Sequence, residues 1–189
     1  MRIIFVTGAP GAGKTFIADY ISDLMRRKEK IMQIGADVVR DILRTNLSEA
    51  DFPALHASSL HEASCAHYIA QTQPVVKLGI VPAVLRGLEE NKSMVFEGVN
   101  CIPSVLKNEL ANINIGNAEI YYIVVAIADE KIHLKQLKQQ NDVDVTAKMG
   151  KIKKIRHMQD FLIADGKKAN ACILEGKDIL EQIENLIAE

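Results

Sequence analysis

The chain has 189 residues, enough for one domain with a substantial core. Its net charge is −1, from 23 Lys and Arg against 24 Asp and Glu, so it lacks the basic excess that long-range attraction to nucleic acid requires. The sequence contains no apolar run of roughly 18 residues that would span a membrane, no signal peptide, and only three widely spaced cysteines, an odd number that argues against a disulfide framework. We therefore expect a cytoplasmic protein that binds neither membrane nor nucleic acid.

Short apolar runs alternate with segments of helical periodicity along the whole chain. A proline at position 74 divides one long helical stretch, and we expect it to end the first helix there. Residues 45–56 and 141–150 are polar or weakly patterned and are expected to be loops. In chain order we predict a strand at 3–6, a helix at 15–27, a strand at 30–35, helices at 38–43, 57–73 and 75–91, a strand at 93–97, a helix at 103–111, a strand at 119–128, helices at 130–140 and 152–165, a strand at 171–174 and a helix at 178–188.

This alternation predicts an α/β fold in which a five-stranded parallel sheet carries helices on both faces. We see no repeat and no linker, so residues 1–189 are expected to form a single domain. Ligands of such sheets bind at the carboxyl ends of the strands. The polar residues just past those ends are Thr7, Asp37, Glu97, Asn100 and Asp129.

A glycine-rich loop, GAPGAGKT, follows the first predicted strand and precedes the first helix. It matches the Walker A pattern, in which glycines let successive backbone N–H groups wrap around phosphates. Lys14 is expected to reach the β- and γ-phosphates of ATP, and the Thr15 hydroxyl to ligate Mg²⁺. The alternative is a glycine-rich turn with an ordinary surface lysine. The predicted nucleotide site consists of Gly8, Ala9, Pro10, Gly11, Ala12, Gly13, Lys14 and Thr15.

Other sequence motifs and the chain length indicate which reaction the bound nucleotide undergoes. The D-x-x-G and N-K-x-D motifs of a GTPase switch are absent from the sequence, and a large mechanical ATPase would need a longer chain. Transfer of a phosphoryl group to a small acceptor fits the length best.

Two carboxylates are candidates for the acceptor side. Asp37 follows the second predicted strand and is our choice of general base, and Glu97 ends the third strand and is expected to hold Mg²⁺ through water. The alternatives are that Asp37 only caps a helix and that Glu97 only bonds the glycine loop. The residues expected to contact the acceptor are Asp37, Arg40, Arg44, Arg86, Glu97 and Asn100. For the arginines, which suit an anionic group, the alternative is a solvated helix face.

The segments GAPGAGKT, IGADVVRDILR, VFEGVN followed by IPSVL, AIADEKIH and IRHMQDFL resemble, in this order, the 2-phosphoglycerate kinase family of P-loop kinases. The resemblance spans nearly the whole chain. It implies a nucleoside-monophosphate-kinase-like fold, ATP and Mg²⁺, and a small phosphorylated acid as acceptor. It further implies that residues 37–92 form the acceptor-binding helices, that residues 136–152 form a lid, and that Arg156 acts on the phosphates.

The chain departs from that family at three points. Gln136 and Gln140 stand where the family carries lid arginines, and Asn100 stands where it carries a histidine. Lysines near the lid then remain as point charges for the transferring phosphoryl group, without the two-pronged geometry of arginine. These lysines are Lys135, Lys138, Lys148 and Lys151.

The sequence thus favours a small-molecule kinase. Two other readings stay open: a kinase that acts on a nucleotide or a polynucleotide end, which the near-neutral charge disfavours, and a non-catalytic nucleotide-binding regulator. The sequence leaves undetermined the oligomeric state, the identity of the acceptor, and which of Asp37 and Glu97 is the base.

Overall fold

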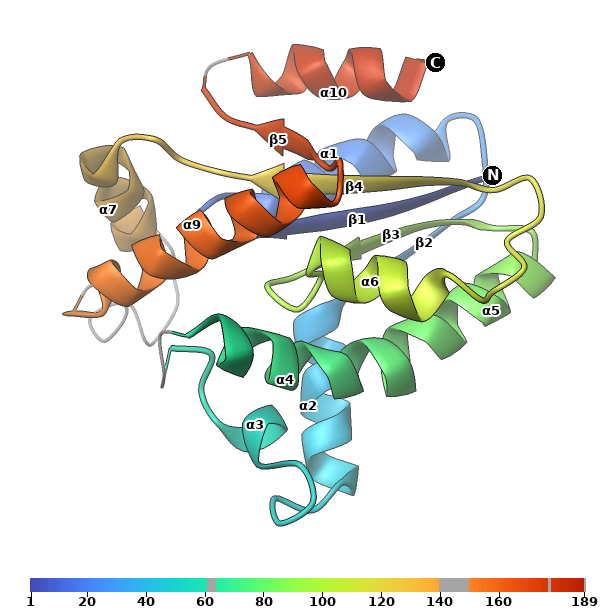
Figure 1. The fold of residues 1–189 in the computed structure, drawn as a ribbon. Coiled ribbons are helices and arrows are strands. Elements are labelled where there is room, and N and C mark those ends of the chain that lie inside the picture. The colour runs from blue at the N-terminus through green and yellow to red at the C-terminus, as the bar shows by residue number, and fades with distance from the viewer. Residues whose placement is uncertain (61–63, 140–149, 177, 189) are drawn as a thin grey trace.

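A computed structural model of the chain describes residues 1–60, 64–139, 150–176 and 178–188. Its centre is the predicted five-stranded sheet, all of whose strand pairs are parallel (Figure 1). The strand order is β2-β3-β1-β4-β5. The strands are β1 (Arg2–Gly8), β2 (Ile31–Gly35), β3 (Ser93–Glu97), β4 (Glu119–Val125) and β5 (Cys172–Leu174).

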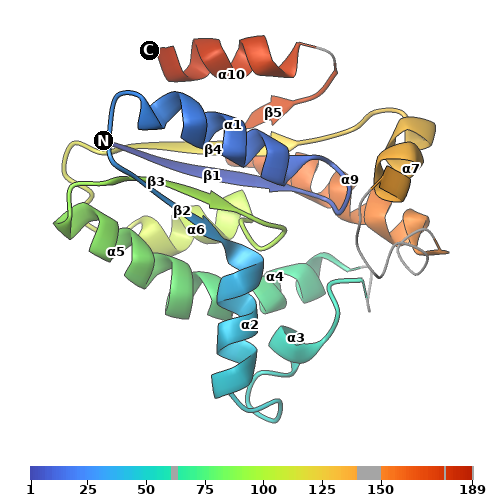
Figure 2. The same cartoon turned by 180° about the vertical axis from the view of Figure 1, so that it is seen from behind.

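Helices cover both faces of this sheet, which explains why the central strands carry consecutive apolar residues, such as residues 3–6 of β1, rather than alternating ones. One face carries α1 (Lys14–Arg26) and α10 (Ile179–Ala188), with Ile21 and Ile183 buried against Ile4 and Val6 (Figures 1 and 2). The other face carries α4 (Cys65–Val75), α5 (Val81–Glu89), α6 (Pro103–Leu110) and α9 (Ile152–Lys168).

The predicted break at Pro74 is wrong. The helix α4 continues through Pro74 into a π-helical turn, η1 (Val76–Ile80), and directly into α5. A proline removes one backbone N–H from the helical ladder, and a π-helical turn shifts the ladder by one residue, so the chain stays helical past the missing donor. The buried side chains of Val75, Val76 and Ile80 hold this stretch against the core.

Two further helices lie between β2 and α4 in the chain. The helix predicted at 38–43 is longer, α2 (Ala36–Asn46), and the segment predicted to be irregular contains a short helix, α3 (Pro53–His56). Apart from Ala36, both lie within residues 37–92, which the family resemblance implies are acceptor-binding (Figure 1).

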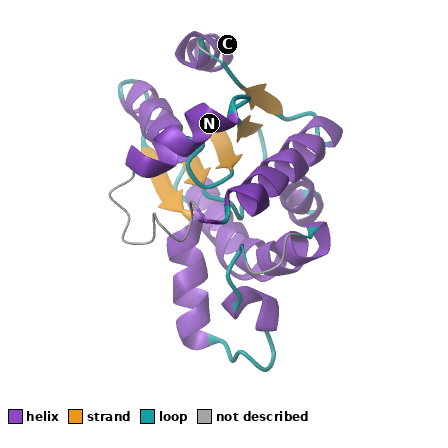
Figure 3. Cartoon of the chain, turned by 90° about the vertical axis from the view of Figure 1, so that its left-hand side faces the viewer, coloured by secondary structure: helices purple, strands orange, loops and turns teal. Residues whose placement is uncertain are grey.

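The helix α7 (Glu130–Gln139) follows β4 and lies at the carboxyl edge of the sheet (Figures 1 and 3). The lid predicted at 136–152 begins in α7 and ends at the start of α9. Its centre, residues 140–149, with Gln140 and Lys148, lies outside the described residues. In the part of the chain that the structure describes, no helix is both long and apolar enough to cross a bilayer.

Candidate active site

The loop between β1 and α1 has the backbone that an anion-binding turn requires. Gly11 and Gly13 have φ angles of 81° and 89°, in the left-handed region that side chains with a Cβ rarely adopt. The turn is closed by the Ala12 N–H, which donates to the Ala9 carbonyl at 3.1 Å. Such turns gather successive N–H groups at a helix N-terminus, here that of α1. The local structure therefore agrees with a phosphate-binding loop at residues 8–15.

Neighbouring elements press closely on this loop. A Cβ on Gly8 would lie 2.7 Å from the Val125 carbonyl oxygen, and a Cβ on Gly11 would lie 2.7 Å from the Leu137 Cδ2. From the same side as Leu137, the His133 Nε2 lies 2.8 Å from the Pro10 carbonyl oxygen. The loop is thus enclosed by β4 on one side and by α7 on another.

The central contact of the site joins the loop to the end of β3. The Thr15 hydroxyl donates a hydrogen bond of 3.2 Å to the Glu97 carboxylate. Parallel pairing places Glu97 opposite Val6 on β1 and opposite Gly35 on β2, so the carboxylate stands at the carboxyl edge of three adjacent strands.

Electrostatics links four predicted residues at this point. Burial raises the pKa of Glu97, Lys14 opposes that rise through its positive charge, and Asp37 adds to it through its negative charge. The structure therefore brings together Lys14, Thr15, Glu97 and Asp37, as the sequence predicts.

Asp37 itself is exposed in the first turn of α2. The residue at the N-cap is Gly35, and the cap has no side-chain hydrogen bond, so the reading of Asp37 as a helix cap is wrong. The first turn of α2 lies against the Glu97 segment, because a Cβ on Gly98 would meet the Ala36 Cβ at 2.9 Å. Asp37 therefore lies exposed beside the Glu97 segment.

By contrast, Asp129 has a local role. Its carboxylate accepts hydrogen bonds from the Lys131 and Ile132 N–H groups, at 2.6 and 3.3 Å, and so caps the start of α7. Thr7 is buried and its hydroxyl has no hydrogen-bond partner in the described structure.

Arg40 lies in α2, a helix expected from the sequence to contact the acceptor, but its guanidinium already donates hydrogen bonds within the protein. It donates to the Leu55 carbonyl at 3.1 and 3.0 Å, to the Ala57 carbonyl, and to the Ser59 hydroxyl at 3.3 Å. Burial lowers the pKa of Arg40, and the positive charge of Arg44 lowers it further. Arg40 therefore holds the 55–59 segment in place, and most of its guanidinium donors are already occupied.

The other two arginines differ in position. Arg44 lies in the last turn of α2, exposed, and pairs with Asp41 at 3.6 Å. Arg86 lies in the last turn of α5, which leads into the amino end of β3, and it pairs with Glu89 and Glu90. Because the P-loop lies at the carboxyl edge, the structure does not bring Arg86 to the site, and its predicted role is corrected. The reason is the direction of the chain. A helix that leads into a parallel strand ends beside the amino end of that strand, which is the edge of the sheet opposite the P-loop.

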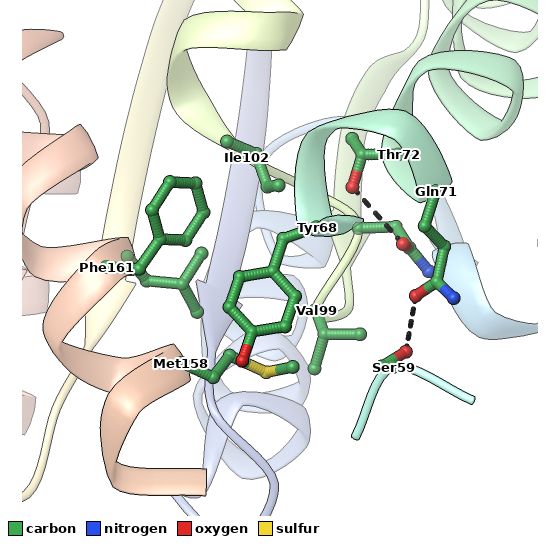
Figure 4. A pocket seen from close by; sticks show the side chains of 10 residues that line it. Ser59, Tyr68, Gln71, Thr72, Val99, Ile102, Met158 and Phe161 are labelled. Atoms are coloured by element: carbon green, nitrogen blue, oxygen red, sulfur yellow. Dashed lines mark hydrogen bonds between the residues drawn. The ribbon is translucent and has the colours of Figure 1, made fainter. Parts of the chain in front are cut away.

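Asn100 is buried, and the Thr72 hydroxyl donates to its Oδ1 at 3.2 Å. Its Nδ2 has no partner in the described structure, and neither does the buried hydroxyl of Tyr68. Both residues line a small cavity between α4, the segment after β3, and α9 (Figure 4). Its volume of about 10 Å³ leaves room for roughly one water molecule. The cavity is lined by Ser59, Tyr68, Gln71, Thr72, Val99, Asn100, Ile102, Met158, Phe161 and Leu162.

Arg156, expected to act on the phosphates, is tied to the connection between β4 and α7. It donates to the Ile127 carbonyl and, at 3.0 Å, to the Ala128 carbonyl. Gln159, one turn further along α9, donates to the Ile127 carbonyl and accepts from the Ile127 N–H, each at 3.0 Å. These contacts fix the connection that leads into α7. Because α7 packs against the P-loop, they also help to position that side of the loop.

The sequence predicts no individual role for His133, yet this residue contacts the P-loop. It is fully buried, and burial lowers its pKa. The usable signal in the sequence was its spacing: His133 and Leu137 stand four apart on one helical face, and both are buried.

Together, the sheet order, the P-loop between β1 and α1, and the carboxylate at the end of β3 define an α/β fold of the P-loop kinase type. Residues 2–77, from β1 into η1, match the model of the Zeta toxin family. The predicted fold is therefore confirmed.

The chain is a distant homologue of 2-phosphoglycerate kinases, as its segments predict. It is 24% identical over 202 residues to the 2-phosphoglycerate kinase of Methanopyrus kandleri, and 25% identical over 202 residues to that of Methanocaldococcus jannaschii. The alignments cover 98% and 99% of this chain but 59% and 63% of the two relatives. The chain thus spans about three-fifths of the length of these relatives.

Among solved structures, an uncharacterized protein from Eubacterium ventriosum has the same fold. Its TM-score is 0.54 at 14% sequence identity, and the match covers 100% of this chain and 97% of the other.

Proposed function

We propose that this chain is a kinase that transfers the γ-phosphoryl group of ATP, in the presence of Mg²⁺, to a hydroxyl of a small anionic metabolite of the 2-phosphoglycerate type. The proposal rests on the homology to proteins named 2-phosphoglycerate kinase and on the residues around the P-loop. Because the relatives are longer and distantly similar, the acceptor is the part that needs experiment.

The single observation that carries the proposal is the hydrogen bond between Thr15 and Glu97. A hydroxyl and a carboxylate beside a phosphate-binding lysine are the donor set that Mg²⁺ takes in P-loop enzymes, together with phosphate oxygens. Among the described residues, no three His, Cys, Asp or Glu side chains form a cluster, and Mg²⁺ bound through substrate phosphates needs none. When bound, Mg²⁺ would neutralise charge on the β- and γ-phosphates.

Phosphoryl transfer requires two functions from the protein's own residues. The P-loop and Lys14 hold the β- and γ-phosphates and so aim the γ-phosphorus at the acceptor. Asp37 accepts the proton of the acceptor hydroxyl as that oxygen bonds to the γ-phosphorus. The bond between the γ-phosphorus and the bridging oxygen breaks, and that oxygen leaves with ADP.

The acceptor would lie between α2, α4 and the segment after β3. Beside this space, Asn100 and Tyr68 line the small cavity between α4, the segment after β3 and α9, which has room for roughly one water molecule, and the Asn100 Nδ2 and the Tyr68 hydroxyl are buried there without partners in the described structure. Such donors suit carboxylate, phosphate or hydroxyl oxygens, and an unpaired buried donor is costly until a ligand or water satisfies it.

The first test is release of ADP from Mg·ATP, measured with 2-phosphoglycerate and with a panel of small hydroxy acids and sugar phosphates. The matched variants are Asp37→Asn and Asp41→Asn, two carboxylates of the same helix, the second paired with Arg44 and away from the P-loop. We expect acceptor-dependent release to fall on the order of 100-fold or more in D37N, with ATP affinity unchanged, and to stay near the parent value in D41N.

Two outcomes would redirect the proposal. ADP release driven only by a nucleotide or a 5′-hydroxyl oligonucleotide would make the acceptor a nucleotide or polynucleotide end. Tight ATP binding without transfer to any acceptor would indicate a regulatory nucleotide binder.

A further inference from the structure

The P-loop is held from outside by one buried histidine. His133, on α7, is 0% exposed, and its Nε2 lies 2.8 Å from the Pro10 carbonyl oxygen. One turn along the same helix, Leu137 is also 0% exposed and occupies the space where Gly11 would carry a side chain. The sequence distance between Pro10 and His133 is 123 residues, so the contact joins two otherwise separate parts of the site.

The hydrogen-bonding roles in this contact follow from chemistry. A carbonyl oxygen accepts only, so the His133 Nε2 must carry the proton and donate it. The Nδ1 atom is buried without a partner in the described structure. A neutral ring leaves Nδ1 as an unprotonated acceptor, and burial, which lowers the pKa of His133, favours that neutral form.

The geometry of the peptide unit links this contact to the nucleotide. The chain has no cis peptide bond among its described residues, so the Pro10 carbonyl and the Gly11 N–H lie in one plane and point in opposite directions. A donor on α7 that binds the carbonyl therefore turns the Gly11 N–H away from α7. Gly11 has a φ angle of 81°, in the left-handed region that glycine adopts readily and other residues rarely adopt.

We propose that His133 is a positioning residue for the P-loop: by holding the Pro10 carbonyl, it orients the Gly11 N–H toward the phosphates and thereby sets the affinity for nucleotide. The inference rests on nucleotide binding by the proposed kinase and is independent of the acceptor. The charged groups that act on the ring are Arg156 from α9 and Glu130 from α7 itself, and neither forms a hydrogen bond with it.

The test compares two replacements of similar size. In His133→Gln the side-chain amide can still donate to the Pro10 carbonyl, whereas in His133→Leu the volume is kept and the donor is lost. Ile132→Ala, on the exposed face of the same helix, is the control. Thermal unfolding without nucleotide establishes that each variant is folded, and titration calorimetry with Mg·ATP gives the dissociation constant.

We expect H133L to bind Mg·ATP about tenfold more weakly, while H133Q and I132A stay within roughly threefold of the parent. Where an acceptor is in hand, the loss should appear in KM for ATP more than in kcat. Parent-like affinity in folded H133L would overturn the inference, and so would an equal loss in H133Q. A failure of phosphoryl transfer in the unmodified protein would leave these binding results interpretable.

A second measurement needs no variant and so survives a failure of H133L to fold. Long-range ¹H–¹⁵N correlation spectra of the parent protein report which imidazole nitrogen is protonated. We expect His133 to be the Nε2–H tautomer, with and without Mg·ATP. A proton on Nδ1 alone would place a lone pair against the Pro10 carbonyl and would refute the contact.

Discussion

Thr15 and Glu97 stand 82 positions apart in the sequence, and the hydroxyl of the first donates to the carboxylate of the second at 3.2 Å. One ends the P-loop and the other ends β3, so the contact connects the P-loop to the carboxyl end of a central strand. Its chemistry suits a metal ion bound to nucleotide phosphates, and the predictions for Thr15 and Glu97 depend on it.

The Thr15 hydroxyl should be needed for the effect of magnesium. Thr15→Val keeps the shape and removes the oxygen, whereas Thr15→Ser keeps the oxygen. We expect T15V to lose most of the gain in ATP affinity that Mg²⁺ provides, and T15S to keep it. Fluorescence titrations with an ATP analogue, with Mg²⁺ and with EDTA, measure this gain. Equal gains in T15V and T15S would show that the hydroxyl does not contact the metal.

Replacing Glu97 should separate stability from activity. Its pKa is raised above the ordinary value of 4.5, mainly by burial, so the folded protein holds the proton more tightly than the unfolded chain does. The ionised carboxylate therefore costs stability as pH rises above that ordinary value. We expect Glu97→Gln to unfold at a higher temperature than the parent at pH 7, with a smaller difference at pH 4, and to lose transfer activity. An E97Q protein that is less stable at pH 7 would contradict this explanation.

Gly11 should tolerate no side chain. Alanine there would adopt φ 81°, at a cost of about 1–2 kcal/mol, and would also strike Leu137. The matched control is Gly116→Ala, with φ 58° and nothing within 4 Å of the added Cβ. We expect the free energy of unfolding to fall in both, by about 1–3 kcal/mol more in G11A because of the overpacking. Only G11A should weaken ATP binding. Denaturant unfolding and nucleotide titration of the pair measure both effects.

His133 should make stability depend on pH in the mildly acidic range. Burial lowers its pKa below the ordinary 6.5, so the unfolded chain takes up a proton at this residue that the folded protein resists. The free energy of unfolding should accordingly fall as pH drops below about 6.5. In H133Q, which has no ionisable group there, this part of the decline should vanish. Parallel denaturant titrations between pH 7.5 and pH 5 compare the two proteins, and identical slopes would exclude the effect.

Arg40 should contribute to the stability of the fold, although the sequence predicts only a role in acceptor binding for it. Arg40→Lys keeps the charge but cannot reach the Leu55 and Ala57 carbonyls and the Ser59 hydroxyl together. We expect a loss of about 1–3 kcal/mol in the free energy of unfolding, against no more than about 1 kcal/mol for Arg44→Lys, whose pair is exposed. Comparable, small losses in both would mean that the Arg40 contacts contribute little.

The sheet was predictable because its strands are short apolar runs, and three of them, β1, β2 and β3, end in glycine or glutamate. The P-loop was predictable because its motif states a backbone requirement, which Gly11 and Gly13 fulfil with positive φ angles. Glu97 and Asp37 were found from one rule, that ligands bind where parallel strands end.

The predictions from sequence were wrong or incomplete where tertiary packing overrides the local sequence pattern. Pro74 looked like a helix end, yet a π-helical turn after it keeps the chain helical. Arg86 looked like an acceptor ligand, but its position at the end of α5 puts it near the opposite edge of the sheet. His133 was missed as an individual site residue because its partner is a backbone carbonyl 123 residues away, which no pattern of side chains announces.

The most direct test of the central claim follows the γ-phosphoryl group itself. ³¹P spectra of the protein with Mg·ATP and 2-phosphoglycerate, which has one free hydroxyl, show where that group goes. The kinase proposal predicts ADP and a bisphosphorylated product in equal amounts, abolished by Lys14→Met. If the γ-phosphate stays on ATP, or appears only as inorganic phosphate, while ATP is bound, transfer to this acceptor is contradicted.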